Sequence, residues 1–197
     1  MKEINLNLSH KASMTVDMNN LPKPDDMGCI NLGTLDLSIS FKEIQTAREN
    51  GGRVLYGAIE LTQKIENILC DYLFGVSVRP SNEKSFFRYN ILQSSSFSSD
   101  FKRQALGEIL KTSKLISVRE QRNLDKNIRQ FFKWRNAFAH GDLSHDNNLG
   151  TSLKYHSGAS KTLKLDDAFW SDLEATYIRC TDILDLIQEQ ISNKSQN

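Results

Sequence analysis

Over most of this chain, apolar residues recur at spacings of three and four, the period of amphipathic α-helices. Such stretches begin near residues 53, 100, 118 and 167. The last one is long, with this apolar face: Phe169, Leu173, Tyr177, Cys180, Leu184, Ile187 and Ile191. The pattern predicts a mainly α protein, a bundle of four or five helices of which two are long.

Short alternating segments add small β elements. Residues 3–9, "EINLNLS", have the two-residue period of a half-buried strand, and residues 30–40, "INLGTLDLSIS", repeat it with a phase slip of the kind a bulge makes. Residues 152–165 predict a hairpin that turns at Ser157–Gly158. It would be a short β-hairpin before the last helix.

A capping box at Ser40 and Glu43 predicts a short helix that the pair Gly51–Gly52 ends. We therefore expect residues 1–52 to form an N-terminal extension of short strands and a short helix. Residues 53–197 would form the helical domain.

Composition narrows the class of protein. The chain of 197 residues is long enough for one sizeable core, and its net charge of +1 means that any nucleic-acid surface must be a local patch. Cys29, Cys70 and Cys180 lie far apart without a C-x-x-C pair, which indicates a reduced compartment. No signal peptide and no membrane-spanning run is visible, so we expect a cytoplasmic protein without membrane contact.

The stretch from residue 118 to residue 140 carries the most informative chemistry. A capping box at Ser117 and Glu120 predicts its start, and Arg135 falls near the middle of its apolar sector. Burying an unpaired guanidinium costs several kcal/mol. Arg135 must therefore meet an anion or an interface there, or else extend to solvent or pair with a carboxylate of a neighbouring helix.

The opposite side of the same helix carries a row of cations. A row at this spacing can follow a phosphate backbone, although a solvated face would look the same. The candidate RNA-binding residues are Arg122, Lys126, Arg129 and Lys133, and Arg119 extends the row.

Two polar residues stand one turn apart at the end of this helix. The amide of Asn136 can hold one ring nitrogen of His140 and leave the other for proton transfer, or His140 merely stabilises the helix end. Five residues subtend about 140° on a straight helix. Arg135 and His140 can therefore meet only if the helix breaks between Ala139 and Gly141, or across a dimer interface.

The segment "RNAFAH", residues 135–140, resembles the R-x4-H motif of the HEPN superfamily (higher eukaryotes and prokaryotes nucleotide-binding domains), in its R-N-x-x-x-H form. The helical layout of residues 53–192 is similar too. The resemblance implies a helical bundle that dimerises with its motifs facing, and a metal-independent endoribonuclease. Such proteins act in toxin–antitoxin pairs, in phage defence or in RNA processing.

Carried over to this chain, the resemblance makes Arg135 and His140 the catalytic pair and Asn136 a supporting polar residue, with Glu60 as a candidate further supporting residue. RNA supplies its own 2′-hydroxyl nucleophile, a histidine transfers the proton and a guanidinium stabilises the phosphorane. The implied partners are RNA, a second copy of the chain and an antitoxin or defence-system protein.

Other interpretations stay open beside this one. A HEPN-like module could bind RNA or nucleotide, or assemble with a partner, without cutting. The dimer would make Phe131 and Phe138 candidate interface residues. We expect no cofactor and no metal, because the cluster of His140, Asp142, His145 and Asp146 falls in a predicted loop without rigid ligand spacing.

Overall fold

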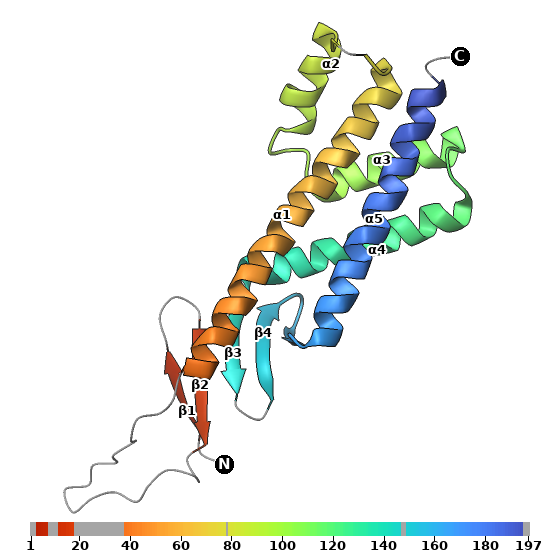
Figure 1. The fold of residues 1–197 in the computed structure, drawn as a ribbon. Helices are drawn as coiled ribbons and strands as arrows, with labels where there is room; N and C mark the ends of the chain where they lie inside the picture. The colour runs from red at the N-terminus through yellow and green to blue at the C-terminus, as the bar shows by residue number, and fades with distance from the viewer. Residues whose placement is uncertain (1–2, 8–11, 18–37, 78, 147–148, 195–197) are drawn as a thin grey trace, which may run out of the picture. The chain divides into compact units, whose positions relative to one another are not determined.

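The computed structural model describes residues 3–7, 12–17, 38–77, 79–146 and 149–194, with side chains from residue 41 onward. The elements follow one another in this order (Figure 1): β1 (Glu3–Asn7), β2 (Ala12–Asp17), α1 (Ser38–Phe74), α2 (Asn82–Phe86), the π-helix η2 (Phe87–Leu92), α3 (Ser99–Ser113), α4 (Val118–His140), β3 (Asp142–Asp146), β4 (Gly150–His156), β5 (Ser160–Lys164) and α5 (Asp167–Lys194). The prediction of a mainly helical protein with a short β-hairpin before the last helix is confirmed.

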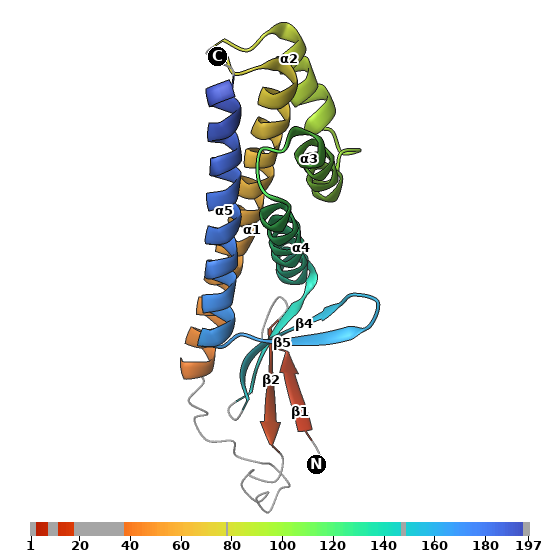
Figure 2. The ribbon, with the colours of Figure 1, turned by 90° about the vertical axis from the view of Figure 1, so that its right-hand side faces the viewer.

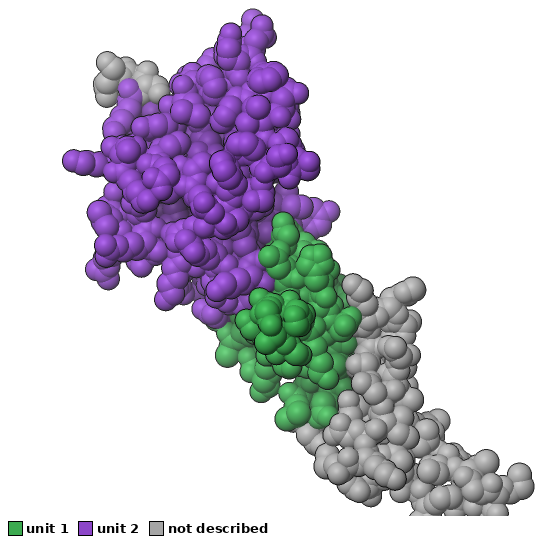
Figure 3. All heavy atoms as spheres, turned by 180° about the vertical axis from the view of Figure 1, so that it is seen from behind, with its two compact units in different colours: residues 1–55, 135–171 green, residues 56–134, 172–197 purple. Residues whose placement is uncertain are grey.

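The chain divides into two compact units, which Figure 3 colours separately. Unit 1 comprises residues 1–55 and 135–171, and unit 2 comprises residues 56–134 and 172–197. The border expected after residue 52 lies inside α1.

The prediction that Gly51–Gly52 ends a short helix is wrong, because α1 continues through both glycines. A Cβ atom on Gly51 would lie 2.7 Å from Cδ1 of Phe138, so the missing side chain lets this ring pack directly against the backbone of α1. That packing offsets the roughly 1 kcal/mol that glycine costs inside a helix relative to alanine. The capping box predicted at Ser40 is also wrong, since α1 begins at Ser38.

Unit 1 contains the sheet, in the order β1-β2-β3-β4-β5, with β2 and β3 parallel and the other neighbours antiparallel. Strand β1 and the β4–β5 hairpin were predicted, and Gly158 takes a φ of +72° in the turn, which suits glycine. A strand was expected over residues 30–40. Residues 30–37 lie outside the described residues, and residues 38–40 are helical, so the expectation is wrong for these last three. The core of unit 1 consists of Ala47, Ala137, Leu143, Leu153 and Leu165.

Unit 2 is helical. Its parts of α1 and α5 lie side by side and run in the same direction (Figures 1 and 2). The Tyr177 hydroxyl donates to Glu60, and further along the Gln188 amide donates to Asp71. The predicted apolar face of α5 is buried at Cys180, Leu184, Ile187 and Ile191.

Candidate functional site

The helix that carries "RNAFAH" is continuous from Val118 to His140. Its start has the predicted capping box: the Ser117 amide donates to Oε2 of Glu120 at 2.8 Å, and the Glu120 amide donates to Oγ of Ser117 at 3.2 Å. The helix therefore does not break before His140. The Cα atoms of Arg135 and His140 keep the angular separation of about 140° that five helical residues impose.

The guanidinium of Arg135 is held by an amide and by no described carboxylate. Its Nη1 donates to Oδ1 of Asn136 at 2.8 Å, and within the described part of the chain the Arg135 side chain makes no other hydrogen bond or ion pair. The residue is only partly buried. Partial burial and a bond to the exposed side chain of Asn136 fit an arginine whose stem is covered and whose charged end extends toward solvent, one of the alternatives that the sequence left open.

Asn136, which binds the charged end of Arg135, stands one helical turn before His140. Residues four apart differ by only about 40° on a helix and are neighbours on its surface. Both Asn136 and His140 are exposed. The amide was expected to hold the imidazole; it holds the guanidinium of Arg135 instead.

Gly141 fixes the backbone directly after the motif. Its amide donates to the carbonyl oxygen of Ala137 at 2.7 Å. A Cβ atom at Gly141 would lie 2.5 Å from that same oxygen and 2.9 Å from both Cδ1 of Leu153 and the carbonyl oxygen of Lys154. Only glycine allows β4 to pass this close to the end of α4. The sequence pattern did not predict this close approach of Gly141 to β4.

The aromatic residues around the motif are packed within their own units. Phe131 is 1% exposed, and its ring lies 5.6 Å from that of Tyr177 in unit 2. Phe138 is partly buried in unit 1, where its ring stacks on Trp170 at 5.8 Å. The expectation that Phe131 is an interface residue rather than core is therefore wrong, and Phe138 already has partners in its own unit.

Glu60 lies in unit 2, whereas the motif lies in unit 1. It is exposed and accepts a hydrogen bond from the hydroxyl of Tyr177. Burial, and then this bond, raise the pKa of Tyr177 to about 12. Glu60 therefore has a structural partner within unit 2.

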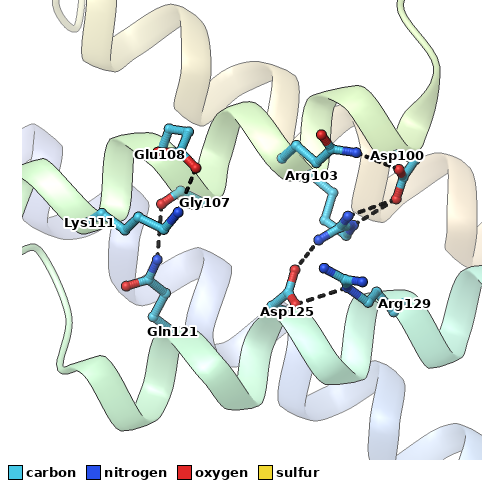
Figure 4. A network of polar contacts seen from close by, with 9 residues as sticks. Asp100, Arg103, Gly107, Glu108, Lys111, Gln121, Asp125 and Arg129 are labelled. Atoms are coloured by element: carbon cyan, nitrogen blue, oxygen red, sulfur yellow. Dashed lines mark hydrogen bonds and ion pairs between the residues drawn. The ribbon is translucent and has the colours of Figure 1, made fainter.

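The predicted basic row is exposed at Arg122, Lys126, Arg129 and Lys133. Nε of Arg129 lies 2.9 Å from Oδ2 of Asp125, whose other oxygen binds Arg103 (Figure 4). Arg122, Lys126 and Lys133 make no ion pair with any described residue. Three members of the row thus keep their charge available, and Arg129 is partly neutralised.

Of the four residues expected to cluster in a loop, His140 is the last residue of α4, and Asp142, His145 and Asp146 lie in strand β3. His145 is buried there, and its Nδ1 lies 3.0 Å from Oε2 of Glu43 on α1 and 3.0 Å from Oγ1 of Thr151. It therefore joins the sheet to α1, whereas His140 is exposed. Across the described ranges, no three His, Cys, Asp or Glu residues are grouped so that they could hold a metal ion.

Neither the helices of the protein nor comparison with known proteins indicates a function. Of the helices in the described residues, none has both the length and the apolar character needed to cross a membrane. Comparison of the chain with protein-family models, with curated proteins and with solved structures found no match. The motif and its geometry are therefore the observations that bear on its function.

Proposed function

We propose that this protein is a metal-independent, HEPN-like endoribonuclease in which Arg135 and His140 are catalytic and Asn136 positions Arg135. The observation that carries the proposal is the contact between Nη1 of Arg135 and Oδ1 of Asn136, 2.8 Å long and one helical turn from His140. It gathers a guanidinium, an amide and an imidazole at an accessible helix end.

The guanidinium is suited to a phosphate because no described carboxylate neutralises it. The neutral amide of Asn136 accepts one of its N–H groups and leaves the others available. A guanidinium presents paired donors whose geometry matches phosphate oxygens, and such charge-assisted bonds are strong. Arg135 would bind the scissile phosphate and stabilise the charge that develops in the transition state.

His140 would transfer the proton. In the reaction, the 2′-oxygen forms a bond to phosphorus and gives its proton to the imidazole, while the bond from phosphorus to the 5′-oxygen breaks and that oxygen takes up a proton. The products are a 2′,3′-cyclic phosphate and a 5′-hydroxyl. No metal is required, because the substrate itself supplies the nucleophile.

A homodimer is part of the proposal, because one chain offers a single motif histidine while the reaction uses both a base and an acid. Two motifs facing across a two-fold axis would supply one imidazole for each role. Light scattering should then give twice the chain mass of 22.5 kDa. A monomer that still cuts RNA would contradict the shared cleft.

Only the resemblance to HEPN proteins supports a proposal about the biological pathway and the protein partners. It favours a cytoplasmic toxin–antitoxin or phage-defence protein whose activity a partner restrains. The exposed row of Arg122, Lys126, Arg129 and Lys133 would contact further phosphates of the RNA.

Incubation of the purified protein with total RNA tests the proposal. We expect cleavage that EDTA leaves unchanged, with 2′,3′-cyclic phosphate ends. His140→Ala and Arg135→Ala should each lower the rate by about 100-fold or more, because each removes proton transfer or charge stabilisation. The control is Glu174→Ala, an exposed residue of unit 2 that lies outside the motif and the basic row, which should cut at the wild-type rate.

Three results would contradict the nuclease. Equal cleavage by wild type and His140→Ala would assign the activity to a contaminant, and loss of cleavage in EDTA would indicate a metal enzyme. Binding of RNA without any cleavage would favour the alternative, a non-catalytic HEPN-like module.

A further inference from the structure

The β4–β5 hairpin of unit 1 has one face made of hydrogen-bond donors. Its register pairs Lys154 with Thr162 and His156 with Ser160. Because side chains alternate between the two faces of a strand, the residues that share this face are Ser152, Lys154, His156, Ser160, Thr162 and Lys164. We call this set the hairpin face.

The opposite face of the hairpin packs on the core except at the exposed residue Lys161. Leu153 is buried, and Tyr155 and Leu163 pack against the core cluster of unit 1. This packing fixes which way the hairpin is turned. The lysines of the hairpin face are consequently exposed to solvent.

The hairpin is a local concentration of positive charge in a chain whose net charge is only +1. Residues 150–164 include three lysines and no Asp or Glu. Lys154 makes no ion pair with a described residue, although Asp142 stands opposite it in β3. Nζ of Lys164 lies 3.4 Å from Asp166 in an exposed pair, which contributes little and leaves the lysine accessible.

The hairpin face begins beside the motif. The carbonyl oxygen of Lys154 would lie 2.9 Å from a Cβ atom on Gly141, the residue directly after His140. Asp142, the next residue, pairs with Lys154 in the sheet. A strand of RNA whose scissile phosphate lay at His140 would therefore have further phosphates within reach of this face.

We propose that the hairpin face binds the phosphate backbone of the RNA substrate next to the Arg135–His140 site; this rests on the proposed function. Lysines, hydroxyls and an imidazole suit phosphate oxygens, and phosphate contacts carry no sequence information. The aromatic ring of this hairpin, Tyr155, packs on the core and is not placed to stack on bases. The face therefore binds single-stranded RNA of any sequence.

The test is the salt dependence of RNA binding, measured with fluorescent single-stranded RNAs of two unrelated sequences. Binding is measured with His140→Ala, so that the RNA stays intact. Log affinity falls as log salt rises, so the slope is negative. Adding Lys154→Ala and Lys164→Ala should make it less steep by about 1.4, or about 0.7 for each phosphate that a lysine no longer neutralises. The decrease should be equal for both sequences.

Three further variants serve as controls in the same assay. Lys154→Arg with Lys164→Arg keeps the charge and should keep the slope. Lys111→Ala with Lys194→Ala removes two exposed charges of unit 2, outside the predicted row, and should leave the slope unchanged. Lys126→Ala with Lys133→Ala measures the contribution of the row on α4 separately.

An unchanged slope in the Lys154→Ala, Lys164→Ala protein would overturn the proposal, as would an equal decrease in the unit 2 control. A change in the mass measured by light scattering, with the slope unchanged, would make the hairpin a protein interface. The two proposals fail separately. Cleavage with an unchanged slope refutes the hairpin face alone, and a changed slope without cleavage by wild type refutes the nuclease alone.

Discussion

The buried cations of unit 2 and the more exposed cations around the motif in unit 1 differ in their partners. In unit 2, the buried side chain of Lys102 is paired with Glu66 at 2.5 Å, and Arg103 is bound by both Asp100 and Asp125 (Figure 4). In unit 1, Arg135 is held by an amide, and Lys154 makes no ion pair with a described residue. Lys102 and Arg103, the two buried cations compared in unit 2, are neutralised within the protein, whereas Arg135 and Lys154 in unit 1 have no described counter-charge. This contrast separates cations that hold the fold from cations suited to bind a ligand.

The largest effect is expected where a buried pair of unit 2 is broken. Glu66→Ala should lower the free energy of unfolding by about 3–5 kcal/mol, because it leaves the buried ammonium of Lys102 without a counter-charge. Denaturant unfolding measures this. The control is Glu108→Ala, whose partner Lys111 is exposed, and which should cost no more than about 1 kcal/mol. Equal effects would remove the distinction between buried and exposed pairs.

A smaller effect is expected at the glycine that follows the motif in unit 1. Gly141→Ala should lower the free energy of unfolding by about 1–3 kcal/mol, because its methyl group would overlap two backbone oxygens. It should also lower RNA cleavage, since the backbone next to His140 must move. Gly107→Ala in α3 meets no atom within 4 Å and should instead stabilise the protein by up to about 1 kcal/mol. Thermal unfolding of the two variants side by side distinguishes close packing from helix propensity.

The smallest change in stability is expected at the cation of the motif. Arg135→Ala should alter the free energy of unfolding by less than about 1 kcal/mol, because it breaks no ion pair with a described residue. The same variant should lose RNA cleavage. A loss of stability as large as that of Glu66→Ala would make Arg135 a structural cation and end the contrast between the units.

Local patterns predicted what depends on neighbouring residues. The apolar period of α5, the capping box at Ser117 and the turn at Gly158 are all properties of short segments, and they appear as expected. The continuation of α1 through Gly51 was not predictable, because it depends on a ring 87 positions away, that of Phe138. Strand β3 was missed for a similar reason: its residues are mostly polar, and its partner β4 decides the pairing.

The residues of the candidate site come from the sequence motif, whereas their geometry could not be predicted from it. The helical wheel put Arg135 in the apolar sector, and the residue is partly buried, but a wheel positions a Cβ atom and says nothing of where a long side chain ends. The hydrogen bond to Asn136 decides that, and it joins adjacent residues that a wheel sets about 100° apart. The role of Gly141 depends on the position of β4, which no local pattern around the motif determines.

The borders of the two units have a consequence for inheritance and for engineering. The chain passes from one unit to the other at residues 55, 134 and 171, within α1, α4 and α5 respectively. Separable domains usually meet in exposed linkers, which can be cut or rejoined. Here each border between the units lies inside a hydrogen-bonded helix, and each unit is made of two separate segments of the chain. Neither unit is therefore encoded by one continuous stretch of sequence. Recombination could not transfer the motif with its sheet as one module, and the two units have to be inherited together.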